Sequence, residues 1–487
     1  MRRTRRRIVR AEEATTVTET SSEFAAHLAA ELGAFVHLPA TPAYRTALDG
    51  VYFPEASRRI PLCVVQPRDV DDISRTLRVA QVSGGRVTVR GGGLSSNCVA
   101  DDAAMIDLST HLGSALPMDG SVRVGGGATV GTALDALAPH GRVIPVGVAQ
   151  LPGMGMVTRG GIGYLTRSLG LTLDHLVEVD MVLPSGEVVH LSEDSTGEKA
   201  ELWWAVRGCA PCFGVVSGAV LRTHEQGPVF VDRVVVDVDA LPAYFAVAPE
   251  LPRHTTMSAV LVWVPGASHE DPVLFLYTAC RSQAEADIAA ARSATTAVAA
   301  ASPAGTRYRS EMSGRYLKGL PQFAIPGPAG EEPAPITLPP PGADRGWFLG
   351  KAAFAGPTLG PEVAAVLSDA IRSAPTTSCR IDFQHTGGAL ADIADTATSF
   401  WGRGAEWNIP LNAVWANPHD GEACHEWARA TLGSLAEDTI GGYSVELRPG
   451  FDETQREVEC AYGANLEPLR ALRRRYDPSG VLGGCPL

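Results

Sequence analysis

Three glycine-rich segments have the residue types and the spacing to bind a ligand through the backbone. The longest runs from Pro145 to His175 and holds seven glycines, at 147, 153, 155, 160, 161, 163 and 170. Glycine at this density costs conformational entropy, and it is favoured where the backbone turns through positive φ or lets a ligand approach its N–H groups. A second cluster precedes it at Val89–Asn97, and a third segment follows at Trp203–Gly218. Together they favour a ligand site over an ordinary glycine-rich turn.

Two common nucleotide-binding patterns are absent. The sequence has no GxxxxGK[ST], and it has no GxGxxG that opens a helix after a strand with an acidic residue at the expected distance. The glycine clusters therefore predict neither a P-loop nor a Rossmann site.

The three segments, in this order, resemble the FAD domain of the berberine-bridge-enzyme-like oxidases, within the vanillyl-alcohol-oxidase superfamily of PCMH-type FAD-binding proteins. The resemblance runs from about Tyr52 to the C-terminus, where residues 462–465 and 476–478 match the last motifs of the family. It implies an FAD cofactor held by Arg90, Gly91, Gly92, Gly93, Leu94, Ser95, Gly147, Gly153, Met154, Gly155, Val157, Gly160, Gly161, Gly163, Val215, Val216, Tyr462 and Asn465.

The resemblance also implies an α+β fold. We expect an FAD-binding domain of two α+β subdomains at 21–224 and a substrate-binding domain at 225–440, with an antiparallel sheet backed by helices. Residues 441–487 would return to the FAD-binding domain. Residues 1–20 are basic without an apolar segment behind them, so we interpret them as a disordered tail rather than a secretion signal.

Two departures from the family concern the flavin. Many relatives attach FAD covalently through a His and a Cys, and those positions are Leu94 and Ala149 here. Neither side chain is a nucleophile, so we expect non-covalent FAD with a milder potential. The family residue that controls oxygen access corresponds to Pro152, whose ring is about as small as valine. We therefore expect an oxidase rather than a dehydrogenase.

Flavin oxidation of an alcohol or amine needs a base for one proton. Relatives carry a catalytic tyrosine in a YxNY strand, which corresponds here to Tyr443–Glu446 with Glu446 in place of the second tyrosine. In an ideal strand these two residues face opposite ways, so a bulge or twist must decide which one points inward. His385 is a third candidate base, and Asn412 and Trp415 are expected to line the substrate pocket.

Hydrophobic periodicity predicts the elements that position these residues. An amphipathic helix is expected at 69–85, followed by a strand at RVTVR that leads into the first glycine cluster and a further strand at AMIDLS after it. Later strands are predicted at 230–238, 257–265, 272–280, 379–385, 411–416 and 441–450, with helices at 283–301, 360–373 and 425–438. The Pro- and Gly-rich stretch 302–346 predicts no regular structure and is either a surface excursion or a lid.

Composition excludes several classes of protein. A net charge of −13 argues against a nucleic-acid partner, and no apolar run reaches the ~20 residues that a membrane helix needs. Nine cysteines without framework spacing suit a reducing cytoplasm. The CxxC motif at Cys209–Cys212 is a redox pair, half of a metal site, or simply two small residues that fill tight positions in the core. The sequence has no second CxxC or CxxH that would complete a zinc site, so we do not predict a metal.

We therefore expect an FAD-dependent oxidase of a small organic molecule, an intermediate of secondary metabolism, with molecular oxygen as the second substrate. The alternatives are a flavoprotein that catalyses a cyclisation or isomerisation without net redox change, and an FAD-binding scaffold.

Overall fold

The computed structural model describes residues 23–146, 149–264, 272–315, 320, 323–325, 332, 338, 340 and 343–487. The expected basic tail at 1–20, Gly147 and much of the Pro- and Gly-rich stretch lie outside these residues. Within them, no helix combines the length and the apolar character that crossing a membrane requires.

The N-terminal half contains two main sheets. The first has the order β1-β2-β4-β3, in which β4 is parallel to β2 and to β3. Its strands are β1 (Val36–His37), β2 (Cys63–Val65), β3 (Arg86–Arg90) and β4 (Ala103–Asp107). The second is an antiparallel sheet of order β5-β6-β10-β8-β9. Its strands are β5 (Ala115–Met118), β6 (Ser121–Gly125), β8 (Leu176–Val182), β9 (Val188–Ser192) and β10 (Val215–Arg222).

Helix α3 (Val70–Ser83) connects β2 to β3, as the sequence pattern predicts. The Asp69 carboxylate caps its first turn by accepting a hydrogen bond from the Asp72 N–H, and Gly84 ends it in the left-handed region at φ 62°. Ile73, Leu77 and Ala80 are buried. The other elements of this half are α2 (Pro42–Asp49), α4 (Val130–Leu137), β7 (Arg142–Val143), α5 (Met154–Val157), α6 (Thr166–Leu169), α7 (Glu198–Cys209) and β11 (His224–Glu225).

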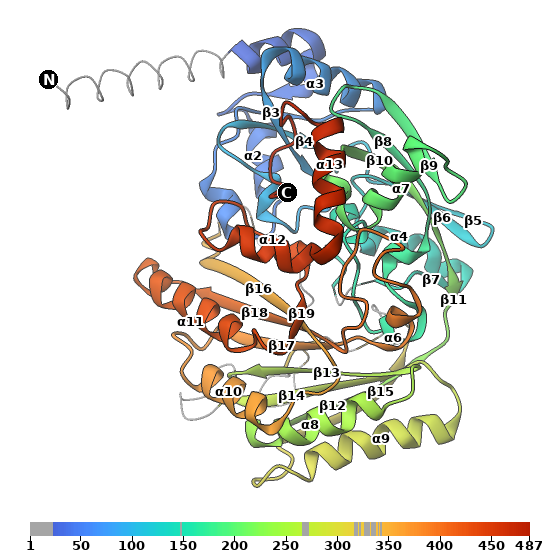
Figure 1. Cartoon of the computed structure of the whole chain (residues 1–487), viewed down its shortest axis with the longest axis vertical. Helices are drawn as coiled ribbons and strands as arrows, with labels where there is room; N and C mark the ends of the chain where they lie inside the picture. The colour runs from blue at the N-terminus through green and yellow to red at the C-terminus, as the bar shows by residue number, and fades with distance from the viewer. Residues whose placement is uncertain are drawn as a thin grey trace, which may run out of the picture.

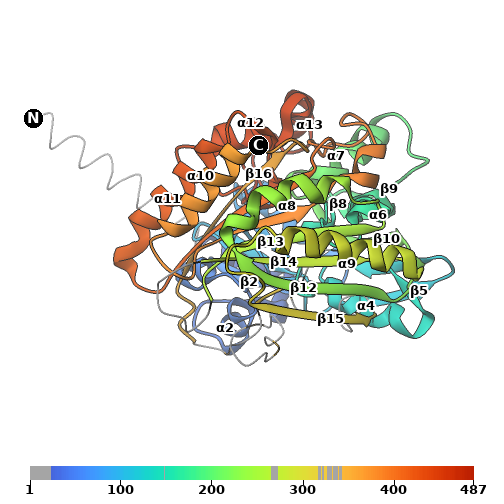
Figure 2. The same ribbon diagram turned by 90° about the horizontal axis from the view of Figure 1, so that it is seen from below.

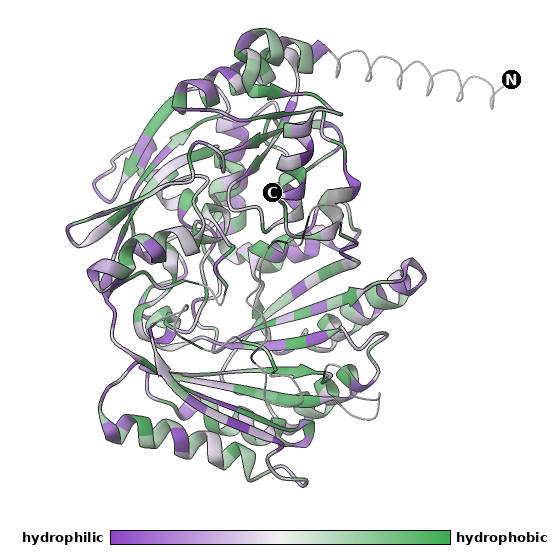
Figure 3. Ribbon diagram, turned by 180° about the vertical axis from the view of Figure 1, so that it is seen from behind, coloured by the Kyte–Doolittle hydropathy of each residue, from purple (hydrophilic) through white to green (hydrophobic). Residues whose placement is uncertain are grey.

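The second half is built on one eight-stranded antiparallel sheet of order β15-β12-β14-β13-β17-β18-β16-β19. Its strands are β12 (Val229–Asp237), β13 (Thr255–Val262), β14 (Val273–Cys280), β15 (Tyr308–Gly314), β16 (Trp347–Ala355), β17 (Arg380–His385), β18 (Trp407–Trp415) and β19 (Thr439–Gly441). Four helices cover one face (Figures 1 and 2): α8 (Leu241–Val247), α9 (Glu285–Ala299), α10 (Pro361–Arg372) and α11 (Gly421–Ser434). These helices carry both hydrophilic and hydrophobic residues, as expected for helices with one buried face (Figure 3).

Both faces of this sheet are buried, which explains its long apolar strands. In β14, Leu274 and Leu276 belong to the core under the helices, whereas Phe275 and Tyr277 belong to the core shared with the N-terminal half. Tyr277 stacks on Tyr164, a residue of the long glycine-rich segment, with ring centroids 4.7 Å apart. Because successive side chains of a strand point to opposite faces, β14 packs against the helices on one side of the sheet and against the first half of the molecule on the other. The expected α+β class is confirmed.

The C-terminal residues return to the first half. After α12 (Thr454–Tyr462) and α13 (Leu466–Tyr476), the chain lies against β3 (Figure 1). The Val87 N–H donates to the Val481 carbonyl at 2.8 Å, and the Gly483 N–H donates to the Val87 carbonyl at 2.7 Å. A disulfide joins Cys212 to Cys485 across 273 positions. The spacing of the cysteines in the sequence does not predict this pairing, because only the fold brings the two residues together.

Two predicted elements differ from the structure. The strand expected at 441–450 is confined to β19, and Ser444–Glu446 form a 3-10 turn instead. Within the stretch expected to lack regular structure, residues 308–314 form the edge strand β15, which pairs with β12. This segment contains no proline, so its N–H groups are free to join the sheet.

Candidate functional site

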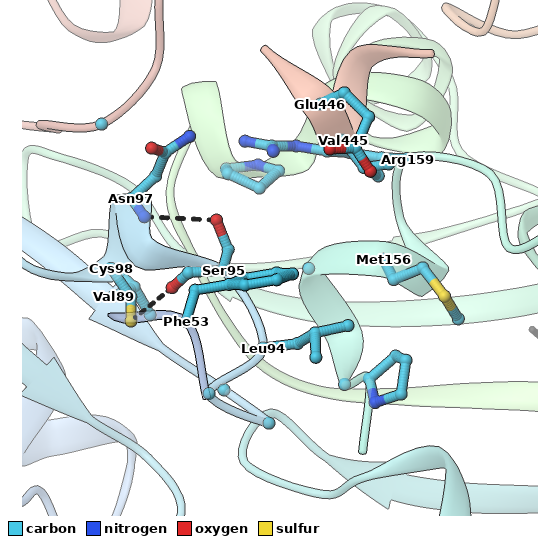
Figure 4. Close-up of a pocket in the computed structure, with 18 of the residues that line it drawn as sticks. Phe53, Val89, Leu94, Ser95, Asn97, Cys98, Met156, Arg159, Val445 and Glu446 are labelled. Carbon is cyan, nitrogen blue, oxygen red and sulfur yellow. Dashed lines mark hydrogen bonds between the residues drawn. The ribbon is translucent and has the colours of Figure 1, made fainter. Parts of the chain in front are cut away.

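A cavity of about 280 Å³ lies between the two halves of the molecule (Figure 4). Seven parts of the chain that are distant in sequence line it: Phe53, the end of β3 with the glycine cluster after it, the long glycine-rich segment, Pro211, the end of β17, the turn after β19 and the C-terminal tail. The lining residues include Phe53, Val89, Gly91–Ser95, Asn97, Cys98, Ala149, Pro152, Gly153, Gly155, Met156, Arg159, Ile162, Pro211, Gln384, Tyr443, Val445, Glu446, Arg448 and Leu482–Gly484.

The first two glycine-rich segments contact each other backbone to backbone at this cavity. A Cβ atom on Gly92 would lie 2.6 Å from the Leu151 carbonyl oxygen and 2.7 Å from the Gly153 nitrogen. A Cβ on Gly153 would lie 2.5 Å from the Gly92 nitrogen. Neither glycine has a positive φ, so close approach, and not the left-handed conformation, requires them.

Arg90 supports the first glycine cluster from behind. Its guanidinium donates to the Ala47 carbonyl at 3.0 Å and to Asp107 at 3.2 Å. It is buried and does not line the cavity. The structure therefore gives this residue of the family motif a role in holding the loop.

Most of the other expected cofactor residues lie behind the cavity wall. Asn465 donates from its side chain to the Asp395 and Thr398 carbonyls, and the Tyr462 hydroxyl contacts the Cys209 thiol at 3.2 Å. The expected residues that do not line the cavity are Arg90, Met154, Val157, Gly160, Gly161, Gly163, Val215, Val216, Tyr462 and Asn465. A motif match identifies segments near the cavity without showing which backbone atoms or side chains face it.

Both positions that carry the flavin attachment in relatives line the cavity, as Leu94 and Ala149. Cys98 lines it too, although sequence alignment places it out of register. Its thiol donates to the Ser95 carbonyl at 3.0 Å, and burial raises its pKa to about 12. The side chain is therefore a neutral thiol rather than a nucleophilic thiolate.

The 3-10 turn brings Tyr443 and Glu446 to the cavity together. The Glu446 N–H donates to the Tyr443 carbonyl at 3.0 Å, and both side chains line the wall. The expected conflict between opposite strand faces does not arise, because residues three apart in a 3-10 turn lie on the same side. The Tyr443 hydroxyl accepts a hydrogen bond from the Gly161 N–H at 2.9 Å.

Both side chains have raised pKa values. Burial raises the pKa of Tyr443 to about 12, against the opposing effect of the Gly161 and Ile162 N–H groups. Burial also raises the pKa of Glu446, and the charge of Asp382 adds to this shift while the Arg448 guanidinium, 3.6 Å away, opposes it. The Glu446 side chain keeps 26% of its surface exposed, so it can reach a ligand.

His385 does not face the cavity. Its Nδ1 accepts a hydrogen bond from the Met257 N–H at 3.0 Å, which places the ring proton on Nε2, 2.7 Å from Glu406. The Arg167 guanidinium also pairs with Glu406. Burial lowers the pKa of His385 to about 4. Its neighbour Gln384 lines the cavity instead, because successive residues of β17 point to opposite faces.

Asn412 and Trp415 also lie away from the cavity lining. Asn412 donates to the Asp382 carboxylate at 3.2 Å, and Trp415 stacks on Trp347 with ring centroids 6.3 Å apart. Both belong to β18, and neither is among the residues that line the cavity. Asn412 is connected to the site only indirectly: it donates a hydrogen bond to Asp382, and the charge of Asp382 contributes to the raised pKa of Glu446.

Comparison with known proteins gives the same interpretation. Residues 61–192 match the FAD binding domain family. An FAD-linked oxidoreductase of Dictyostelium discoideum is 24% identical over 432 residues, covering 86% of each chain. The chain contains an FAD binding domain and is similar to FAD-linked oxidoreductases. Other curated relatives align over about half of their own length or less.

Solved structures show the fold of this oxidoreductase. BBE-like 1 of Physcomitrella patens superposes with a TM-score of 0.79 at 19% identity, covering 95% of this chain and 98% of that one. Glucooligosaccharide oxidase from Acremonium strictum, described with a 6-S-cysteinyl, 8α-N1-histidyl FAD, has a TM-score of 0.77 at 22% identity, with 95% and 99% covered. The fold is therefore the berberine-bridge-enzyme-like one.

The residues around the cavity of this oxidoreductase fit FAD. The glycine cluster offers backbone N–H groups without side chains in front of them, as a diphosphate needs. Two buried polar atoms of lining residues have no hydrogen-bond partner in the described part of the chain: Asn97 Oδ1 and Arg159 Nε. Unsatisfied buried groups of this kind indicate a ligand.

The described residues contain one cluster of side chains that could hold a metal ion, and a disulfide occupies two of its three members. Among the described residues, one group of side chains lies close enough together to hold a metal ion, namely the sulfurs of Cys209, Cys212 and Cys485, within 4.8 Å of one another. Two of these sulfurs form the disulfide. The CxxC motif therefore contributes one half of a covalent link to the C-terminal tail, with Cys209 beside it as a free thiol.

Proposed function

We propose that this enzyme is an oxidase that removes a hydride and a proton from a small organic alcohol or amine, with Glu446 as the base. The observation that carries the proposal is the 3-10 turn that presents Glu446 and Tyr443 to one cavity. When bound there, non-covalent FAD would accept the hydride.

The two side chains suit different tasks. Glu446 has a carboxyl whose pKa is raised by burial, and its ionised form can accept the O–H or N–H proton of the substrate. Tyr443 has a raised pKa and stays protonated at neutral pH. Its phenol is held by the Gly161 N–H and can donate a hydrogen bond that orients the substrate.

A second cavity, of about 370 Å³, lies behind this turn and shares Tyr443 and Glu446 with the first. It is lined by charged groups, including Lys351, whose ammonium pairs with Glu453 at 3.0 Å and Glu457 at 2.5 Å. Glu446 therefore has charged side chains behind it, to which it can pass the proton that it takes from the substrate.

Leu94 and Ala149 support non-covalent flavin. Glucooligosaccharide oxidase holds FAD through a histidyl and a cysteinyl bond. Here the corresponding side chains are both at the cavity, and neither can form such a bond. We further propose that the substrate is an intermediate of secondary metabolism, as the sequence resemblance implies.

The first test is anaerobic mixing of the purified holoenzyme with a panel of small alcohols and amines. A substrate should bleach the visible absorbance of the flavin, and air should restore it with formation of hydrogen peroxide. Conversion of a compound without bleaching of the flavin would favour a cyclase or isomerase. If no compound of the panel is converted and none bleaches the flavin, a scaffold would be favoured. Acid precipitation should leave all flavin in the supernatant; flavin in the pellet would contradict the non-covalent assignment.

A further inference from the structure

Arg159 has an unusual position for a cation. It follows α5 and precedes the Gly160–Gly161 turn, and its N–H donates to the Met156 carbonyl at 3.0 Å. This short turn directs its side chain to the cavity, where it lies beside Val445 and Glu446 (Figure 4). Arg159 lies between Gly155 and the Gly160–Gly161 pair. A tight turn of this kind requires glycine and does not require a charged side chain.

No protein group in the described part of the chain neutralises this charge. Arg159 Nε is buried without a hydrogen-bond partner, and no carboxylate of the described residues lies within 4.0 Å of the guanidinium. The other arginines near the site are paired: Arg90 with Asp107, Arg167 with Glu406, Arg403 with Asp174 and Arg448 with Glu446. A partly desolvated cation without a partner is costly, so the site calls for an anion from outside the chain.

The other groups that face Arg159 do not supply that anion. The side chains of Tyr443, Tyr462 and Cys209, whose pKa values its charge lowers, are all held neutral by burial. Glu446 already has Arg448 as its cationic neighbour. The positive charge in the cavity therefore exceeds the negative charge.

The other residues that line the cavity indicate the chemical character of the rest of the ligand. Phe53, Met156, Ile162 and Val445 line it with apolar surface. Leu94, the residue that follows the run of glycines suited to a diphosphate, lies across the cavity from Arg159 and Glu446 (Figure 4). The cation is thus on the side of the proposed base, away from the glycine cluster.

We propose that Arg159 binds the carboxylate of the substrate, and that the substrate is a carboxylic acid with an aromatic or aliphatic body. A guanidinium offers two parallel N–H groups that match a carboxylate and fix its orientation. Held in this way, the acid would present its oxidisable carbon beside Glu446. This inference rests on one part of the proposed function, namely that the substrate and the flavin bind in the same cavity.

The test uses the oxidised holoenzyme and needs no turnover. Sodium benzoate and benzamide, which differ in charge but hardly in shape, are titrated while the flavin spectrum is recorded. Benzoate should perturb the spectrum saturably and benzamide should not. Arg159→Gln should raise the Kd of benzoate at least about tenfold, and Arg159→Lys should raise it less, because the charge remains. Arg222→Gln, a change of an exposed arginine, serves as the control and should behave as wild type.

Two results would overturn the proposal. If Arg159→Gln releases FAD while the surviving holoenzyme binds benzoate normally, the guanidinium holds the cofactor and not the substrate. If benzamide binds as well as benzoate to the wild type, the cavity does not select an anion. Because the titration is independent of catalysis, a protein that binds benzoate through Arg159 but never bleaches with substrate would refute the oxidase and leave this inference standing.

Discussion

The hydroxyl of Tyr443 accepts a hydrogen bond from the N–H of Gly161, 282 positions earlier in the chain, at 2.9 Å. The glycine pair allows this approach. Gly160 and Gly161 have φ values of 146° and 86°, and a Cβ on Gly160 would lie 2.9 Å from the Tyr443 ring. The long glycine-rich segment therefore does more than border the cofactor cavity, since it also holds the turn that carries Glu446.

The pH dependence of turnover should report Glu446. Because only the ionised carboxylate accepts a proton, kcat/KM should fall as the pH drops through its raised pKa and level off above it. Glu446→Gln should lower kcat/KM by about 10²–10⁴-fold and flatten this limb of the profile. Glu459→Gln, an exposed change on α12, is the matched control. Wild-type rates in Glu446→Gln would exclude it as the base.

Gly92 should tolerate no side chain, although its φ is ordinary. In Gly92→Ala the new methyl group would meet the backbone of Leu151 and Gly153, which cannot yield as a flexible side chain would. The variant should therefore retain little FAD, measured as flavin absorbance per protein, and melt at a lower temperature. Gly356→Ala is the control, because no atom lies within 4 Å of its added Cβ. A Gly92→Ala protein that stays fully yellow would show that this contact is dispensable.

Pro152 should govern the reaction with oxygen. It lines the cavity, and its carbonyl accepts a hydrogen bond from the Val130 N–H at 2.7 Å, which fixes its position. After anaerobic photoreduction and addition of air-saturated buffer, the wild type should reoxidise within seconds. Pro152→Leu should reoxidise more slowly because a bulkier side chain narrows the path, whereas Pro152→Val should be close to wild type. Reduced flavin that persists for many minutes in the wild type would identify a dehydrogenase.

The disulfide between Cys212 and Cys485 should be measurable and stabilising. Seven of the nine cysteines are free, so a thiol assay in denaturant should count seven before reduction and nine after. Cys485→Ser should lower the free energy of unfolding by roughly 2–4 kcal/mol and weaken FAD retention, because residues 482–484 line the cavity. Cys460→Ser should have neither effect. Nine free thiols in protein purified without reductant would refute the bond.

Two histidines, the buried His385 and the half-buried His224, should make the fold sensitive to acid. Burial lowers the pKa of His385 and of His224 to about 4, from an ordinary value of 6.5. Between these values the unfolded chain binds protons that the folded chain excludes, so the free energy of unfolding falls as the pH drops from 6.5 to about 4. Above 6.5 this contribution is complete. His224→Gln should make the melting temperature less dependent on pH over this range, whereas His190→Gln, at an exposed position, should not.

Local patterns in the sequence predict much of this enzyme. The three glycine segments and their order indicate FAD, and Leu94 and Ala149 lead to the prediction that it is not covalently attached. Helix α3 and strands such as β12 and β14 are predicted because the 3.6- and 2-residue periods express which side chains are buried. These properties depend on residues close together in the chain.

Long-range packing decided the rest. The sequence pattern at Tyr443–Glu446 is compatible with a strand, and only the contact with Gly161 and the geometry of the 3-10 turn place both side chains at the cavity. The register of β17 puts Gln384 there and buries His385. The partner of Cys212 is 273 positions away, and only the tertiary structure shows that Arg159 Nε has no hydrogen-bond partner among the described residues. Such pairings depend on the tertiary fold, because a local pattern states that a residue is buried without stating against what.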